Sequence, residues 1–146
     1  RRRPMLYALA AVVVAALGLF AVVAWIQSTK IYGFDTTAST PAAAGLPTVR
    51  VVRFRSEDGH EVAVWIAPPA AGKPVLLSFY GNFASVAGSA ARLAPLLEQG
   101  NGLAMLVYRG SSGEGGVPSE AAFAADARAL YDQLDALLGA AVPPQR

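Results

Sequence analysis

The residue types that most often carry catalytic chemistry are scarce in this sequence. Its 146 residues contain no Cys and a single His, His60. The absence of Cys removes disulfides, a thiolate nucleophile and Cys-ligated zinc, and one His does not build a multi-His metal site. The sequence therefore predicts neither a metal site nor a cofactor.

Serine-based acyl transfer needs a Ser on a G-x-S-x-G turn between a strand and a helix, followed along the chain by an acid and a His. No G-x-S-x-G occurs, since Ser89 lacks the pattern and Ser111 and Ser112 lie in a loop before a helix. No acidic partner or nucleophile is evident for His60, which we interpret as an exposed turn residue. A complete triad is not predicted within these residues.

The charge balance excludes nucleic acid as a partner. The sequence has 12 Lys+Arg and 10 Asp+Glu, and a pI near 9.2. Arg1, Arg2 and Arg3 account for the positive net charge, because 9 basic and 10 acidic residues remain after them. Phosphate-neutralising affinity needs a basic stripe, and none is present.

Residues 5–26 form an uncharged apolar stretch of 22 positions, preceded by the short basic segment of residues 1–4 with its three arginines. A helix of this length is about 33 Å long, enough to cross a hydrocarbon core of about 30 Å. The three arginines predict a cytoplasmic N-terminus and an extracytoplasmic domain. The bilayer is thus an expected partner of residues 5–26. A cleaved signal peptide and a buried core helix are the alternatives.

Residues 27–47 form a linker rich in Ser, Thr, Pro and Gly, which is either a tether or a segment that runs along a domain surface. The strands and helices that must position any site come after it. Residues 48–55 and 61–67 predict a hairpin around Asp58 and Gly59. Residues 74–80 and 103–108 read as buried parallel strands.

Two helices are expected between and after these parallel strands. One runs from about Ser85 to Gln99, is kinked or divided at Pro95, and stops at Gly100. The other begins at an N-cap on Ser119 and continues to Gly139. This order of elements predicts an α/β fold over residues 48–146.

Two motifs in this region resemble the α/β-hydrolase superfamily, in particular its BEM46-like membrane-anchored branch. Residues 77–82 (LSFYGN) resemble the branch's strand-end His-Gly-Asn, with Tyr80 in the place of His. Residues 108–126 are similar to its Tyr-Arg-Gly…Pro-Ser-Glu…Asp pattern, with Ser111 and Ser112 in the place of Tyr-Gly. The resemblance covers about residues 48–146. It implies an antiparallel hairpin and parallel strands with crossover helices, as in the N-terminal part of that fold.

The resemblance also implies a site. Gly81 lets the backbone turn sharply so that the following N–H groups can face a developing oxyanion. The family's donor position corresponds to Asn82, and Phe83 is the next candidate. The alternative is an ordinary strand-to-helix turn.

Charged residues of the second motif are expected to be structural. Arg109 would pair with a loop carboxylate, and Glu120 or Asp126 with a helix end.

By this resemblance the chain is the N-terminal fragment of a membrane-anchored serine hydrolase. Its substrate in the intact protein would be a small acyl ester or amide. The nucleophile Ser, the acid and the His are expected beyond Arg146, so the chain alone is predicted to be inactive. The alternative is a non-catalytic, membrane-anchored interaction module with an α/β-hydrolase-like domain.

Overall fold

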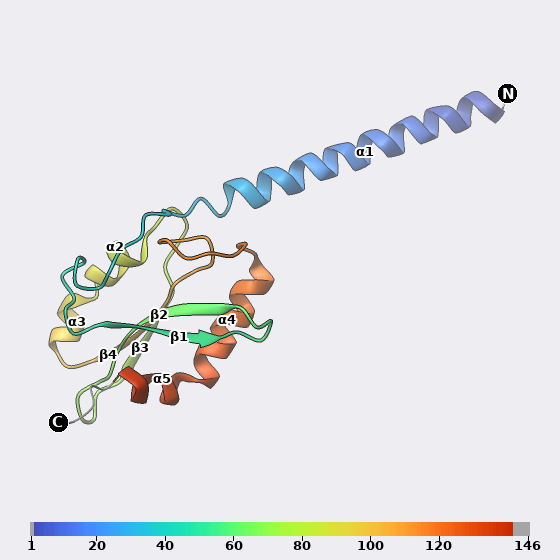
Figure 1. Cartoon of the computed structure of the whole chain (residues 1–146). Coiled ribbons are helices and arrows are strands. Elements are labelled where there is room, and N and C mark those ends of the chain that lie inside the picture. Colours follow the sequence, from blue (N-terminus) through green and yellow to red (C-terminus); the bar gives the residue numbers. More distant parts are fainter. Residues whose placement is uncertain (1, 142–146) are drawn as a thin grey trace. The chain divides into compact units, whose positions relative to one another are not determined.

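The computed structural model describes residues 2–141 (Figure 1). Its contacts divide the chain into two compact units, Arg1–Gly33 and Phe34–Arg146. The first unit contains helix α1, Arg2–Lys30. Its stretch Arg3–Gln27 has a mean hydropathy of 2.7, and none of its most apolar window is buried. Helix α1 is therefore long and apolar enough to span a membrane, and a signal sequence has the same properties.

The second unit, the α/β unit, is built on a four-stranded sheet with the spatial order β1-β2-β4-β3. Its strands are β1 (Arg50–Arg55), β2 (Glu61–Ala67), β3 (Val75–Ser78) and β4 (Gly102–Leu106). β1 and β2 form the predicted antiparallel hairpin, β4 runs antiparallel to β2, and β3 runs parallel to β4. The mixed α/β fold expected from the sequence is confirmed.

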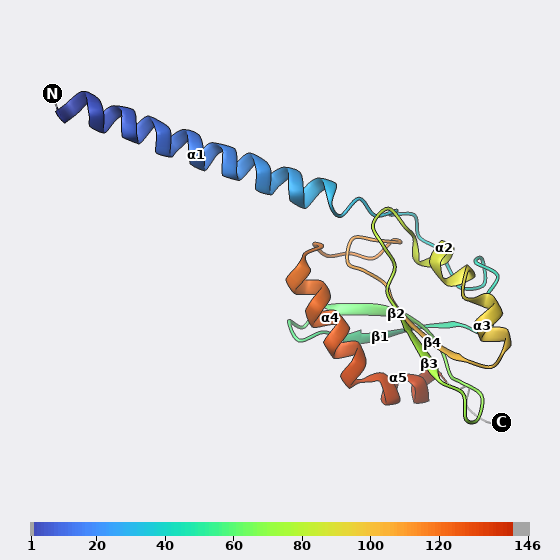
Figure 2. The same cartoon turned by 180° about the vertical axis from the view of Figure 1, so that it is seen from behind.

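Helices cover both faces of this sheet, with α2 (Val86–Ala91) and α3 (Ala94–Glu98) on one face and α4 (Glu120–Asp132) and α5 (Leu134–Ala141) on the other (Figure 1 and Figure 2). Successive side chains of a β-strand point to opposite faces of the sheet. Thus Ala63, Trp65 and Ala67 pack in the core beside α2, and Val62, Val64 and Ile66 pack in the core beside α4 and α5. β2 is buried on both sides, which explains its nearly continuous apolar sequence.

The first predicted helix is divided at the expected place. Ser85 caps α2 by accepting the Gly88 N–H at 3.2 Å, and Pro95 stands in the first turn of α3. Proline has no N–H and fits the first turn of a helix but not its interior. Gly100 ends the segment with a φ of +86°, as expected of a helix stop.

The sequence predicts one helix from Ser119 to Gly139, but the structure has two helices there, α4 and α5. The chain breaks at Gln133, whose backbone departs from helical geometry and whose side chain donates to the Arg55 carbonyl at 3.0 Å. The break turns α5 so that Leu134, Leu137 and Leu138 pack on the sheet. Because this packing outweighs the weak helix propensity of one glycine, α5 continues through Gly139 to Ala141.

Candidate active site

The loops that follow β3 and β4 lie at the same edge of the sheet, since these two strands are parallel. We call the loops at residues 79–85 and 107–119 the carboxyl edge. Loops at the carboxyl ends of parallel strands often hold binding and catalytic residues, because the rigid strands fix the positions of the loops. Both motifs singled out in the sequence lie partly on it.

The predicted oxyanion loop comes directly after β3. Gly81, Asn82 and Phe83 are all exposed, and Phe83 has a φ of +59°, a backbone conformation that non-glycine residues rarely adopt. The Ala84 N–H donates to the Gly81 carbonyl at 3.4 Å and closes the turn. Within residues 2–141, neither the Asn82 N–H nor the Phe83 N–H donates a hydrogen bond. The loop therefore carries two backbone donors that are available to a ligand.

The Tyr80 hydroxyl joins the two loops of the carboxyl edge. It accepts the Tyr108 N–H at 3.0 Å and donates to Ser111 Oγ at 3.0 Å. Ser111 Oγ lies 3.1 Å from Ser112 Oγ, which accepts the Val86 N–H at 3.2 Å. This chain of buried hydroxyls runs from the loop after β4 to the start of α2, on either side of residues 81–85 in the chain. We call Tyr80, Ser111 and Ser112 the hydroxyl network.

Burial sets the protonation of this network. It raises the pKa of the Tyr80 hydroxyl and outweighs the hydrogen bonds to Ser111, Tyr108 and Ser112, which lower it. The hydroxyl therefore remains a proton donor at neutral pH. Ser111 and Ser112 are buried and held in place, Ser112 with a φ of +54° and its N–H donating to the Asp35 carbonyl at 2.7 Å. They serve as structural hydroxyls, in agreement with their dismissal as nucleophiles.

Arg109 sits between two carboxylates. Its Nε donates to Asp126 Oδ2 at 2.9 Å, and its Nη2 donates to Asp58 Oδ1 at 3.0 Å and also to Asp126 Oδ1. The hydrogen bonds to Asp126 and then to Asp58 raise the pKa of Arg109. The Arg109 guanidinium, followed by the His60 N–H, lowers the pKa of Asp58 to about 2. One side chain thereby ties the hairpin turn, the end of β4 and helix α4 together.

The predicted pairing of Arg109 with a loop carboxylate is confirmed by Asp58. Of the two residues expected at a helix end, Glu120 or Asp126, only Glu120 lies there, because Asp126 is completely buried against Arg109. Position 126 lies in the second turn of α4, away from either helix end, and α4 turns it toward the loop after β4. Glu120 stands in the first turn of α4, and the predicted cap is confirmed by the Ser119 side chain, which accepts the Ala122 N–H at 3.1 Å.

His60 lies in the hairpin turn as predicted, but it is half-buried rather than exposed. Its ring faces Gly116, where an added Cβ would lie 2.9 Å from His60 Cε1. No hydrogen bond joins its ring to a hydroxyl within the described residues. His60 therefore has no triad-like geometry in this part of the chain. Among the same residues, no group of His, Asp and Glu is placed to hold a metal ion.

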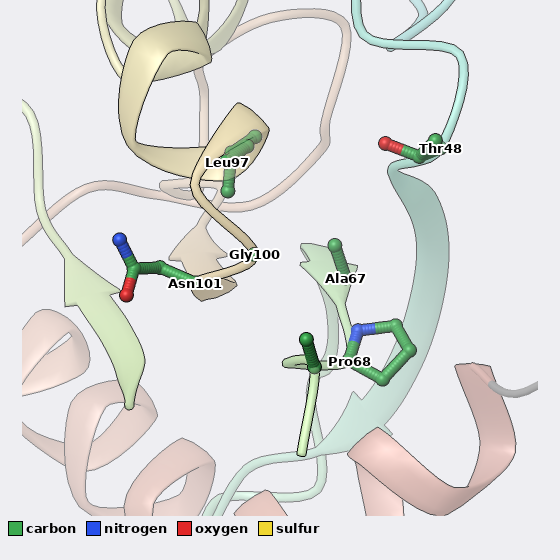
Figure 3. A pocket seen from close by; sticks show the side chains of 7 residues that line it. Thr48, Ala67, Pro68, Leu97, Gly100 and Asn101 are labelled. Atoms are coloured by element: carbon green, nitrogen blue, oxygen red, sulfur yellow. The ribbon is translucent and has the colours of Figure 1, made fainter. Parts of the chain in front are cut away.

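A hollow of about 290 Å³ lies at the opposite end of the sheet (Figure 3). It is lined by uncharged residues, namely Thr48, Ala67, Pro68, Ala70, Leu97, Gly100 and Asn101. The Asn101 side chain is engaged in a hydrogen bond to the Leu96 carbonyl at 2.9 Å. This hollow offers no titratable group for chemistry, so the carboxyl edge is the candidate site.

Sequence reasoning predicted an oxyanion loop at Gly81 and Asn82 but missed the hydroxyl network. Tyr80 was noted only as a departure from the family pattern, and the serines only as poor nucleophiles. The one available signal was that Tyr80, Ser111 and Ser112 all replace residues of the two motifs, at strand ends that must be neighbours. Because these strand ends are neighbours, the three replacements could have been predicted to contact one another.

The sequence was compared with protein families and with known proteins. No family model matches the sequence. Uncharacterized proteins from two strains of Mycobacterium tuberculosis are 36% identical to it over 115 residues, which represent 75% of this chain and 40% of theirs. The chain thus spans about two fifths of the length of these curated relatives.

Solved structures resemble the chain over a similar share. A Pyrococcus furiosus esterase matches with a TM-score of 0.55 and 18% identity, over 75% of this chain and 42% of that one. An α/β-hydrolase from Vibrio vulnificus matches with a TM-score of 0.55 and 21% identity, over 75% of this chain and 41% of that one. The α/β unit therefore has the fold of the α/β-hydrolase superfamily, over part of the length of its members.

Proposed function

We propose that this chain is the N-terminal part of a membrane-anchored serine hydrolase of the BEM46-like branch, acting on ester or amide bonds. Within that enzyme its role is to supply the oxyanion hole. The nucleophile, the acid and the His belong to the segments that follow Arg146. The chain by itself binds the developing charge but performs no covalent step.

The observation that carries this proposal is the pair of unengaged N–H groups at Asn82 and Phe83. They follow β3 at the carboxyl edge, and the loop is held by the Tyr80 hydroxyl on one side and the Ser112 hydroxyl on the other. Preorganised backbone donors stabilise the oxyanion of acyl transfer without reorganisation during the reaction. An ordinary connecting turn needs no such buried support.

The sequence beyond Arg146 provides the first test. A G-x-S-x-G elbow is expected within about 20 residues, because that motif carries the obligatory nucleophile of this fold. The complete protein should then react with a fluorophosphonate at that Ser, and the 146-residue chain should not. Absence of the elbow, or labelling of any serine within residues 1–146, contradicts the proposal.

A second candidate is a non-catalytic anchored module that docks a partner. It is favoured by Tyr80, which stands where the resembling motif has His, and by the lack of a Ser, acid and His arrangement among residues 2–141. A complete protein that contains the elbow, yet is inactive on short acyl esters and co-purifies with one stoichiometric partner, would support this candidate over the enzyme.

The proposed location is a single-pass membrane protein with a cytoplasmic N-terminus and an extracytoplasmic α/β unit. It rests on the apolar helix α1 and the arginines at its start. A cysteine at the exposed Gln99 should react with a membrane-impermeant thiol reagent on intact cells, and the protein should resist extraction by alkaline carbonate. Labelling only after lysis would show the opposite orientation, with the α/β unit in the cytoplasm. Release of a shortened protein would show that α1 is a cleaved signal.

A further inference from the structure

Both ends of the oxyanion loop are held by two adjacent serines. Tyr80 comes directly before residues 81–85, and its hydroxyl donates to Ser111 Oγ at 3.0 Å. Val86 comes directly after them, and its N–H donates to Ser112 Oγ at 3.2 Å. Both serines are buried, so water has little access to these contacts. The position of the two unengaged backbone donors of the loop therefore depends on where the serines lie.

A segment that precedes the sheet contacts the serines in turn. We call residues 34–38 the strap. The Ser112 N–H donates to the Asp35 carbonyl at 2.7 Å. At the next position along the same loop, a Cβ added to Gly113 would lie 2.7 Å from Ala38 Cβ. The strap therefore packs directly against the backbone of the loop that follows β4.

The contact with the strap matters because Ser112 has an unusual backbone conformation. Its φ is +54°, which non-glycine residues rarely adopt. Such a conformation persists only where surrounding contacts impose it. The hydrogen bond to the Asp35 carbonyl is a contact of this kind. Without it, Ser112 is free to return to a negative φ, which turns its side chain away from the Val86 N–H.

The strap also reaches the other end of the oxyanion loop. The centroid of the Phe34 ring lies 6.4 Å from that of Tyr80 and 5.4 Å from that of Tyr108. Aromatic rings at such separations attract one another. The Tyr80 hydroxyl is the group that holds the start of the loop, and it accepts the Tyr108 N–H at 3.0 Å. The strap thus contacts the supports at both ends of the oxyanion loop.

We propose that the strap, Ser111 and Ser112 position the oxyanion loop for catalysis, so that the segment before β1 is a working part of the site. This inference rests on the proposed function and deepens it. The strap fixes the conformation of Ser112, and the two serines fix both ends of the loop. They are positioning residues, because they act through the backbone donors. Since the oxyanion exists only in the transition state, a displaced loop lowers kcat and leaves KM nearly unchanged.

Two variants of the complete protein weaken this support in different ways. Ser112→Gly removes the hydroxyl but keeps the N–H, and glycine adopts a positive φ without strain. Gly113→Ala places a methyl group against Ala38 of the strap. Gly72→Ala is the matched control, because Gly72 has a φ of +71° against +84° at Gly113, and a Cβ there meets nothing within 4 Å. Gly72 lies in the turn before β3, at the other end of the sheet.

Hydrolysis of p-nitrophenyl butyrate measures the effect on catalysis. Ser112→Gly and Gly113→Ala should each lower kcat by about 10- to 100-fold with little change in KM, because the donors are displaced rather than removed. Gly72→Ala should keep the wild-type kcat. Adding Ala38→Gly to Gly113→Ala removes the clashing methyl group and should restore part of the lost kcat, which a general loss of stability does not allow. A wild-type kcat in both test variants, or a loss confined to KM, overturns the proposal.

Hydrogen exchange of the Val86 amide, followed by mass spectrometry, gives a measurement that does not depend on activity. This amide should exchange faster in Ser112→Gly and Gly113→Ala than in the wild type or in Gly72→Ala, because its acceptor is lost or displaced. Unchanged exchange in both test variants overturns the inference even if the protein is an active hydrolase. A wild-type protein with the expected exchange that does not react with a fluorophosphonate overturns the proposed function, and the strap is then only a scaffold.

Discussion

The two ends of the parallel strands β3 and β4 are built in different ways. At the amino end, backbone hydrogen bonds close the connections: the Ala70 N–H donates to the Gly100 carbonyl at 2.8 Å, and the Gly102 N–H donates to the Pro74 carbonyl at 2.9 Å. At the carboxyl edge, side-chain hydrogen bonds also join the loops. Tyr80 reaches Ser111, and Arg109 reaches Asp58, 51 residues away.

The difference separates a structural end of the sheet from a functional one. At the amino end, backbone groups pair with backbone groups. At the carboxyl edge, side chains satisfy the buried groups, and the backbone donors of Asn82 and Phe83 remain unengaged. Two non-glycine residues with positive φ, Phe83 and Ser112, lie there and nowhere else among residues 2–141. Strained backbone persists only where surrounding contacts impose it.

The largest expected effect comes from breaking the buried ion pair of the carboxyl edge. Arg109→Met leaves the Asp126 carboxylate buried without its partner, which costs about 3 to 5 kcal/mol in the free energy of unfolding. Arg53→Met is the matched control, because its pair with Glu114 is half-exposed and such pairs contribute about 0 to 1 kcal/mol. Denaturant unfolding of the complete protein measures both.

A double variant sharpens this test. Arg109→Met combined with Asp126→Leu removes both charges from the buried site and should recover much of the lost stability, since the penalty arises from the unpaired carboxylate. Equal destabilisation by the single variants of Arg109 and Arg53 would show that the buried pair is not what holds this edge.

The amino end should be sensitive to volume rather than charge. At Gly102 an added Cβ would lie 2.9 Å from the Ala67 carbonyl oxygen and 2.9 Å from the Pro69 nitrogen. Because these are backbone atoms that cannot rotate away, Gly102→Ala should destabilise by about 1 to 3 kcal/mol. Gly115→Ala, where a Cβ meets nothing within 4 Å, should change stability by less than about 0.5 kcal/mol. Similar effects at both positions would contradict the close packing.

The hydroxyl network is the next target. Tyr80→Phe keeps the ring in its aromatic contacts but removes the acceptor of the Tyr108 N–H and the donor to Ser111. A loss of about 1 to 2 kcal/mol is expected for these buried groups. Tyr131→Phe, on the exposed surface of α4, serves as the control. If thermal unfolding of the two variants is indistinguishable, the Tyr80 hydroxyl does not support the oxyanion loop.

Local signals in the sequence predicted the elements well. Asp58 and Gly59 marked the hairpin, Pro95 divided α2 from α3, and Ser119 capped α4, because each acts on backbone within a few residues of itself. The break at Gln133 was not predictable in this way. It depends on the Arg55 carbonyl, which only the folded hairpin presents to the Gln133 side chain.

The same distinction applies to the candidate site. Gly81 and Asn82 could be placed on a turn from sequence, since the turn is local. The partners of Arg109 and Tyr80 could not be assigned, because the choice among carboxylates and hydroxyls is made by the packing of α4 and of the loops. The complete burial of Asp126 likewise could not be predicted, because the sequence of α4 alone does not show which of its charged residues faces Arg109.

The smallest expected effect is an acid sensitivity of the contact between Asp58 and Arg109. Asp58 has a pKa of about 2 in the folded protein against an ordinary value of 3.8, chiefly because it accepts hydrogen bonds from Arg109. The unfolded chain therefore binds more protons than the folded chain between these values. The resulting stabilisation is fully present above about pH 4 and is lost as the pH falls toward 2.

Asp58→Asn should accordingly flatten the fall of the melting temperature between pH 4 and pH 2. Part of the slope remains, because the pKa of Asp35 is also lowered by the Thr37 N–H that its carboxylate accepts. Glu98→Gln, on α3 near the amino end of β4, serves as the control. A slope that responds to Glu98→Gln and not to Asp58→Asn would place the acid-sensitive contacts at the amino end, and the contrast between the two ends of the sheet would then be reversed.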